Sequence, residues 1–179
     1  MARITPLRDP EIPPASRPEF DRQQAAHGRV SNMKRTLARS AVAFESLMTW
    51  YPLHDAVSAF LGPRATLIFA HAISDQADCL ICSTFFRRLL AEAGDQPDAL
   101  TLSEREQVLV DFGRQLVRDS NAVGDALYRR LASFLSPDQI VALTTFGALM
   151  IATNVFNNAV VVDLDEYLYA YRKPAAAHG

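Results

Sequence analysis

Cys79 and Cys82 are the residues of this 179-residue chain whose type and spacing most readily do chemistry, and the chain has no other cysteine. If a helix starts near Asp78, the two cysteines are its i and i+3 residues on one face, with Cα atoms roughly 5 Å apart, within reach of a disulfide. Backbone N–H groups at a helix N-terminus favour the thiolate, which is the nucleophilic form of cysteine. The spacing therefore predicts a redox-capable dithiol.

The same pair also has plainer interpretations. Cysteine often serves as a small buried hydrophobe, and this helix face continues through Phe86, Leu89 or Leu90, and Ala93. Burial raises a thiol pKa, against the effect of the helix terminus, and the sequence leaves open which effect is larger. A structural zinc site needs four ligands, and the chain has no second Cys or His pair, so no metal is expected.

The segments that must position the pair are predicted to be helical, and none shows the sustained alternation of a β-strand, so the predicted fold class is all-α. Ser31 is the expected N-cap of a helix whose apolar pattern runs to Tyr51 and is punctuated by Pro52. Further helices are expected over residues 55–60, 64–74 and 124–135. The helix that holds the cysteines is expected to begin at the caps Asp75 and Asp78. A capping box of Ser103 and Glu106 predicts a helix that runs to 118, and Ser136 with Pro137 predicts one that runs to about 160.

Prolines crowd the N-terminal part of the chain, where little periodic pattern is present. Because proline fixes φ and removes a backbone donor, residues 1–17 are predicted to form an extended arm. Residues 18–165 are predicted to form a single helical domain that contains the dithiol, and 166–179 a C-terminal tail. No apolar run of signal-peptide length opens the chain, so a cytoplasmic location is expected.

Charge and hydropathy narrow the expected partners. A formal net charge of -2 provides no electrostatic footprint for nucleic acid or for an anionic membrane. The stretch 140–162 is long and apolar, but it carries Asn154, Asn157 and Asn158, and polar residues inside a bilayer are costly, so a helix buried in protein is the better interpretation. The apolar segments 65–73 and 140–151 exceed what one small helical domain readily buries, which predicts a homo-oligomer.

The residues around the dithiol resemble a known family. The run Arg64–Ser74, RATLIFAHAIS, followed by Cys79-Leu-Ile-Cys82, is similar to the core of the alkyl hydroperoxidase D-like, or carboxymuconolactone decarboxylase, superfamily. Similar features elsewhere are 102–106, 135–140, Asn154 and Asn157, Asn32-x-x-Arg35 and the opening 1–4, and the resemblance covers most of residues 20–162. It implies an all-helical bundle that oligomerises, commonly as trimers or hexamers.

The resemblance also implies roles for the two thiols. Cys82 would be the peroxidatic cysteine, oxidised to a sulfenic acid by a hydroperoxide, and Cys79 the resolving one. The implied partners are a hydroperoxide or disulfide substrate and a dithiol reductant, with no cofactor. The chain departs from the family where active members carry a glutamate and a histidine that relay protons, because Leu67 and Phe86 stand at those positions and neither side chain can move a proton.

Few substitutes for this relay are evident in the sequence. His71 lies eight residues before Cys79 and is retained as a further catalytic candidate. Glu45 and His54 precede it and could approach in space, although a surface or satisfied polar role is the simpler interpretation of each.

Three functions follow from these observations. The first is a thiol–disulfide oxidoreductase of the peroxiredoxin type with weak alkyl hydroperoxide reductase activity. The second is a redox sensor or binding protein that kept the dithiol and lost turnover. The third is a carboxymuconolactone decarboxylase-like enzyme that does not use the thiols.

Overall fold

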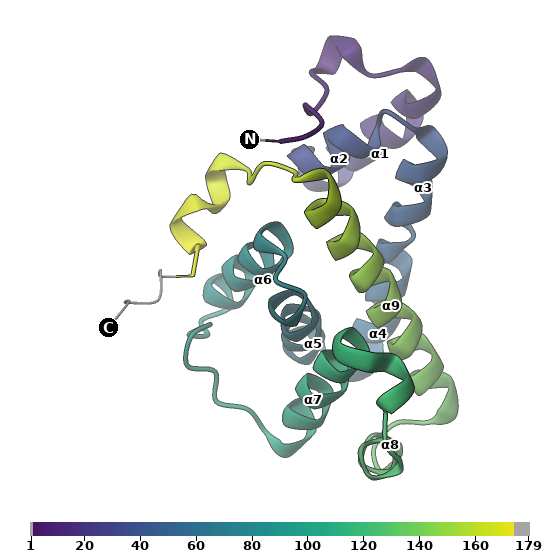
Figure 1. The fold of residues 1–179 in the computed structure, drawn as a ribbon, viewed down its shortest axis with the longest axis vertical. Coiled ribbons are helices and arrows are strands. Elements are labelled where there is room, and N and C mark those ends of the chain that lie inside the picture. The colour runs from purple at the N-terminus through teal and green to yellow at the C-terminus, as the bar shows by residue number, and fades with distance from the viewer. Residues whose placement is uncertain (1, 174–179) are drawn as a thin grey trace.

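The computed structural model describes residues 2–173, which form α-helices and short 3-10 turns with no β-strand among them, and this confirms the all-α prediction (Figure 1). In chain order the elements are η1 (Asp9–Glu11), η2 (Pro14–Ser16), α1 (Arg17–His27), α2 (Asn32–Leu37), α3 (Ala41–Met48), α4 (Trp50–Leu61), α5 (Pro63–Gln76), α6 (Leu80–Glu92), α7 (Glu104–Asp119), η3 (Ser120–Ala122), α8 (Asp125–Ala132), α9 (Pro137–Val160) and η4 (Glu166–Tyr171).

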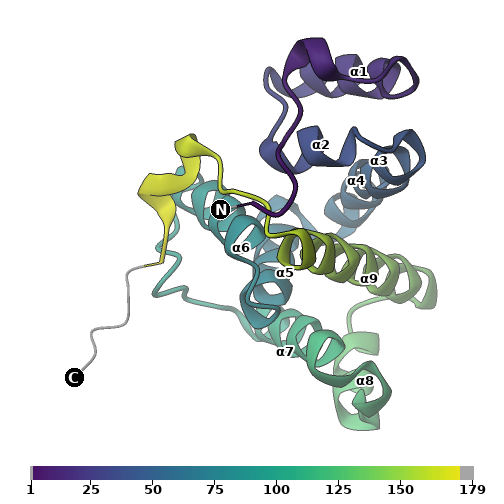
Figure 2. The same cartoon turned by 45° about the horizontal axis from the view of Figure 1, so that its top comes forward.

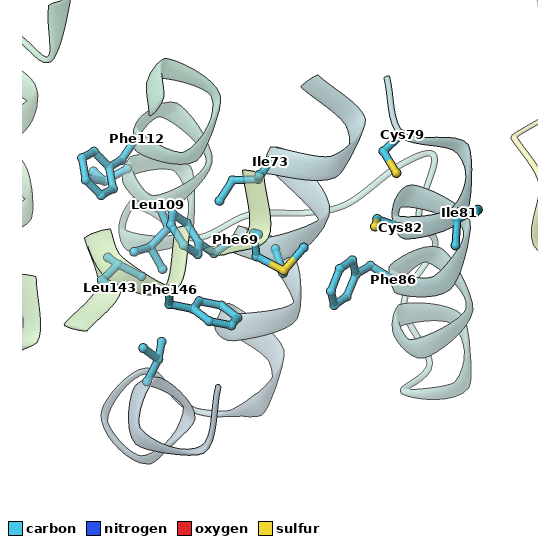
Figure 3. Close-up of a cluster of buried hydrophobic side chains, with 14 of the residues drawn as sticks. Phe69, Ile73, Cys79, Ile81, Cys82, Phe86, Leu109, Phe112, Leu143 and Phe146 are labelled. Carbon is cyan, nitrogen blue, oxygen red and sulfur yellow. The ribbon is translucent and has the colours of Figure 1, made fainter. Parts of the chain in front are cut away.

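Helix α5 is the centre of the main core, packed against α4, α6, α7 and α9. Its fully buried Phe69 lies with its ring centroid 6.2 Å from those of Phe112 on α7 and Phe146 on α9 (Figure 3). Glycines allow this close packing: a Cβ added at Gly147 would lie 2.8 Å from Leu116 Cδ1, and one at Gly113 would lie 3.1 Å from a carbon of Ile73. The core therefore holds α5 firmly, and α5 leads directly into the dithiol.

The N-terminal helices form a second layer beside this core (Figure 2). Helices α1–α3 share a separate cluster of buried side chains, which includes Phe20, Leu37 and Phe44. The preceding segment contains two 3-10 turns, and its Leu7 and Ile12 are buried in the same cluster. This layer thus has apolar packing of its own.

Three of the helix N-caps expected from the sequence are confirmed. Ser31, Ser103 and Ser136 each accept a hydrogen bond from the backbone three residues on, as predicted. The interpretation of Pro52 was wrong, because this proline lies in the first turn of α4, where a backbone N–H has no helical partner to lose. The helix expected after Ser31 also breaks, since α2 ends at Leu37 and Ser40 caps α3.

Helix α9 is long and apolar enough to cross a membrane by length and composition. In the fold it packs against α4, α5, α6, α7 and α8, and it buries Asn154 and Asn157, as expected for a core helix. Val141 and Val155 are exposed on its outer side. Homo-oligomerisation through such surface stays a prediction.

The segment after α9 returns to α6. The 3-10 helix η4 packs on α6 (Figure 1), its Leu168 is buried, and Arg87 of α6 donates a hydrogen bond from Nε to the Tyr171 carbonyl at 2.9 Å. The part of the predicted tail from 174 to 179 lies outside the described residues. Residues 166–173 therefore cover one side of the helix that carries the cysteines.

Candidate functional site

The two cysteines lie at the corner between α5 and α6. After α5 the chain turns through Asp78, whose φ of 49° is left-handed, a conformation that aspartate tolerates better than most residues. The Cys79 N–H then donates to the Ser74 carbonyl at 3.0 Å, and Cys79 itself is the N-cap of α6. Asp75 and Asp78 had been expected to cap this helix; Asp75 instead lies in the last turn of α5, and the cap is one residue after Asp78. Cys79 sulfur therefore lies at the first-turn N–H groups.

Both thiols are free and buried, with 1% of Cys79 and 6% of Cys82 exposed. Their side chains lie on the face of α6 that is turned toward α5, as does Phe86 one turn further on (Figure 3). The predicted i, i+3 arrangement on one helix face is therefore present.

The two thiols differ in acidity. A hydrogen bond from the Cys82 thiol lowers the pKa of Cys79, and the first-turn N–H groups and the Asn157 amide act in the same direction against the effect of burial. The neighbouring Cys79 and burial together raise the pKa of Cys82. The pair thus carries its first negative charge on Cys79, with Cys82 as the hydrogen-bond donor.

Asn157 connects the dithiol to the N-terminal layer. Its Nδ2 donates to Cys82 Sγ at 3.2 Å and to Met33 Sδ of α2 at 3.5 Å. Its Oδ1 has no hydrogen-bond partner among the described residues, and neither side-chain polar atom of the fully buried Asn154 has one. Sequence reasoning noted both asparagines but did not place Asn157 at the thiol. An N–H donor there stabilises a thiolate on Cys82.

Cys82 forms part of the wall of a cavity of about 540 Å³ between the N-terminal layer, α4, α6, α9 and η4. Most of the wall is aromatic, aliphatic or thioether side chain, a composition typical of small-molecule sites. The lining residues are His27, Arg29, Ser31, Met33, Lys34, Leu47, Met48, Trp50, Tyr51, His54, Asp55, Ile81, Cys82, Phe85, Phe86, Arg88, Leu89, Met150, Thr153, Asp165, Tyr167 and Leu168. Cys79 is outside this lining.

A buried lysine in the same wall was not identified from the sequence. Lys34 of α2 is 6% exposed, and its Nζ donates to Gln23 Oε1 and to Tyr51 Oη, each at 2.7 Å. The Tyr51 ring in turn stacks on His27, with centroids 4.5 Å apart. Burial lowers the pKa of Lys34 to about 8 and raises that of Tyr51 to about 12. A single lysine inside a short helix provides no sequence signal for such a site.

Lys34 gives the stability of the fold a pH dependence. Because the folded chain releases this proton near pH 8 and the unfolded chain near 10.5, the unfolded state binds more protons between these values, and stability rises with pH. We expect the free energy of unfolding to increase by about 1–2 kcal/mol between pH 8 and pH 10, and Lys34→Met to lack this part of the increase. Urea denaturation of both proteins at each pH measures it. Identical pH profiles would contradict the prediction.

The other candidates from the sequence are divided between the cavity and other places. His54 lines the cavity, stacks on Trp50 with centroids 4.7 Å apart and has its Nδ1 3.0 Å from Asp55 Oδ1. His71 is outside the lining, burial lowers its pKa, and no hydrogen bond among residues 2–173 joins it to either cysteine. Glu45 is exposed on α3.

The two positions of the absent relay are apolar in different surroundings. Phe86 lines the cavity one helical turn from Cys82, with its ring 6.4 Å from Trp50 and 5.3 Å from Phe85. Leu67 packs against the core from α5 and is outside the cavity lining. Within the described residues, no three His, Cys, Asp or Glu side chains gather closely enough to hold a metal ion.

Comparison with known proteins identifies solved structures with the same fold. No family model and no curated protein matches the chain by sequence. A peroxidase-related protein from Silicibacter sp. TM1040 matches in structure with a TM-score of 0.73 and 18% identity, covering 93% of each chain. The alkylhydroperoxidase AhpD core of a peroxidase-related protein from Ralstonia eutropha JMP134 matches with a TM-score of 0.69 and 17% identity, covering 96% of this chain and 98% of that one.

A third similar structure was determined with a ligand. A variant of the debrominase Bmp8, with one cysteine replaced by alanine, in complex with 2,3,4-tribromopyrrole, matches with a TM-score of 0.76 and 15% identity, covering 94% of each chain. At these identities the similarity establishes the fold. The resemblance inferred from the sequence is confirmed at that level.

Proposed function

We propose that this chain, which has the alkyl hydroperoxidase D-like fold, is a thiol–disulfide oxidoreductase that reduces a small organic hydroperoxide in the cavity beside Cys82. The observation that carries the proposal is the position of Cys82 at the wall of a largely apolar cavity, with Cys79 one helical turn earlier on the same side of α6. The peroxidase-related names of two structural neighbours agree with this chemistry.

Cys79 supplies the base that the missing relay would otherwise provide. The Cys79 thiolate, to which the Cys82 thiol is hydrogen-bonded, accepts the Cys82 proton as Cys82 attacks, so the charge moves to Cys82 only in the course of the reaction. Asn157 Nδ2, 3.2 Å from Cys82 Sγ, stabilises the new thiolate. Leu67 and Phe86 are not needed for this proton transfer.

The reaction then balances with a dithiol reductant. The Cys82 thiolate attacks the outer peroxide oxygen, the O–O bond breaks, and Cys82 becomes a sulfenic acid while the alkoxide takes a proton and leaves as an alcohol. Cys79, which gives its proton to the departing alkoxide and is again a thiolate, attacks Cys82 sulfur, which forms the disulfide and releases hydroxide that takes a proton from the solvent to become water. An external dithiol reduces the disulfide and is itself oxidised.

Formation of the disulfide is the direct test. We expect reduced protein treated with cumene hydroperoxide to form one Cys79–Cys82 disulfide per chain, detected by differential alkylation and peptide mass spectrometry, and to consume hydroperoxide repeatedly when dithiothreitol is present. Thiols that stay free under excess hydroperoxide would contradict the proposal. Reversible oxidation without repeated consumption would identify a redox sensor instead.

A second candidate is reductive dehalogenation of an aromatic compound. It is favoured by the aromatic lining of the cavity and by the structural neighbour described as a debrominase, which binds a tribromopyrrole. The two thiols would supply two electrons, the ring carbon would exchange bromine for hydrogen, and bromide and the disulfide would be the other products. Bromide release from 2,3,4-tribromopyrrole, measured beside hydroperoxide consumption, separates the two reactions.

A further inference from the structure

The charge of Lys34 has no carboxylate partner among the described residues. Its Nζ uses two of its three N–H donors on neutral groups, Gln23 and Tyr51, and it takes part in no ion pair. The nearest acid along this network is Glu19, which accepts from Gln23 and pairs with Arg22 at 3.0 Å. A cation therefore lies in the cavity wall with one donor unused.

Such an arrangement is costly for the folded chain. An ammonium group taken out of water loses several kcal/mol of hydration unless an opposite charge replaces it. A methionine of similar length would fill the same space without this penalty. The Glu19 carboxylate, two hydrogen bonds away, offsets only part of this penalty, and an anion that enters the cavity and pairs with Lys34 would offset more of it.

Cationic side chains outnumber acidic ones in the cavity wall, which contains Lys34, Arg29 and Arg88 together with Asp55 and Asp165. Arg29 lies five residues before Lys34 in sequence, its guanidinium is 4.4 Å from the centroid of Tyr167, and it forms no ion pair among residues 2–173. Arg88 lies over the same ring at 5.2 Å and pairs with Glu92. Asp165 is the buried acid of this wall, and burial raises its pKa.

We propose that the cavity binds an aromatic carboxylate, with the carboxylate on Lys34 and Tyr51 and the ring among Trp50, Phe85 and Phe86. Tyr51 keeps its own O–H to donate, because it accepts from Lys34, so the two groups present two donors to one carboxylate. The proposal of carboxylate binding depends only on these contacts. Only the inference that a substituent of this ligand reaches Cys82 and reacts rests on the proposed function.

The chain contains its own probe for this site. Trp50 is the single tryptophan of the sequence, and it lines the cavity. Benzoate and benzamide are nearly identical in shape and differ in charge, so their titration against Trp50 fluorescence in the reduced protein isolates the effect of the charge. We expect benzoate to bind at least about tenfold more tightly than benzamide, the ratio that one charge-assisted hydrogen bond provides.

Two lysine variants make the matched comparison. In Lys34→Met the preference for benzoate should fall to about one, with benzamide binding unchanged. Lys173→Met, which removes the chain's other lysine, an exposed one that pairs with Asp75, should retain the wild-type preference. A wild-type protein without preference, or a Lys34→Met protein that keeps it, would overturn the proposal.

Further measurements keep the result independent of folding and of redox activity. Should Lys34→Met fail to fold, Tyr51→Phe removes the second donor while the lysine remains, and it should lower the preference several-fold; an unchanged preference there overturns the two-donor site. The titrations contain no oxidant. Loss of anion binding would therefore leave the dithiol chemistry standing, and absence of disulfide formation would leave the anion site standing.

Discussion

Replacing Cys82 by serine should lower the rate of hydroperoxide reduction by roughly a thousandfold or more, to the background rate, because a serine hydroxyl does not ionise near neutral pH and the attacking thiolate is lost. Cys82 is the thiol that lines the cavity, and Cys79 is outside the cavity lining. Steady-state consumption of cumene hydroperoxide with dithiothreitol as reductant measures this change.

Cys79→Ser is the matched control. It removes the resolving thiol and leaves Cys82 at the cavity, so we expect this variant to consume about one equivalent of hydroperoxide and then stop at the sulfenic acid. Because Cys79 has the lower pKa of the two thiols, a first attack by Cys79 is the alternative that these variants also test. A variant Cys82→Ser that is still oxidised by one equivalent would assign the first attack to Cys79. Catalysis that survives in the double variant would point to the decarboxylase-like function without thiols.

Phe86→His should raise the rate of Cys82 oxidation by about 10- to 100-fold, at or below the lower end of the roughly 100- to 10,000-fold that a positioned general base contributes. Residue 86 lies one helical turn after Cys82 and lines the same cavity, so an imidazole there reaches the thiol from the same helix face. The rate of Cys82 alkylation by iodoacetamide as a function of pH, together with hydroperoxide turnover, measures the gain.

The gain has a limit and a cost in this chain. Leu67, outside the cavity lining, provides no carboxylate to orient the new imidazole. Phe86 is 3% exposed, so a buried histidine should also lower the stability by about 1–3 kcal/mol. Phe86→Leu is the control, because it changes packing without adding a base and should leave the pH profile unchanged. Equal rates in the two variants would contradict a relay position at residue 86.

The helices were largely readable from the sequence because their signals are local. A capping serine such as Ser136 satisfies N–H groups two or three residues away, and the Pro137 that follows it fits the first helical position. The prediction that Pro52 interrupts a helix was wrong because proline, which ends one helix, also fits the first turn of the next. The break between α2 and α3 has no glycine or proline to announce it.

The site was only partly readable, since its parts come from distant segments. The i, i+3 spacing of Cys79 and Cys82 is local, and it was predicted correctly. The contact of Asn157 with Cys82 spans 75 positions, and no periodic pattern reports which face of α9 meets α6. Lys34 was not identified from the sequence because it is a candidate site residue only by its burial, and burial is a property of the tertiary structure.

The layer formed by α1–α3 has a consequence for redesign of this protein. Lys34 belongs to α2 and Arg29 to the turn before it, and these helices pack around their own cluster of side chains, whereas both thiols belong to the corner between α5 and α6. The proposed carboxylate contacts of the cavity and the two thiols thus belong to different stretches of the chain, while Phe85 and Phe86 share α6 with Cys82. A library confined to residues 27–51 would therefore vary the charged part of the cavity wall and leave α6, with its sulfur and its aromatic rings, unchanged in sequence.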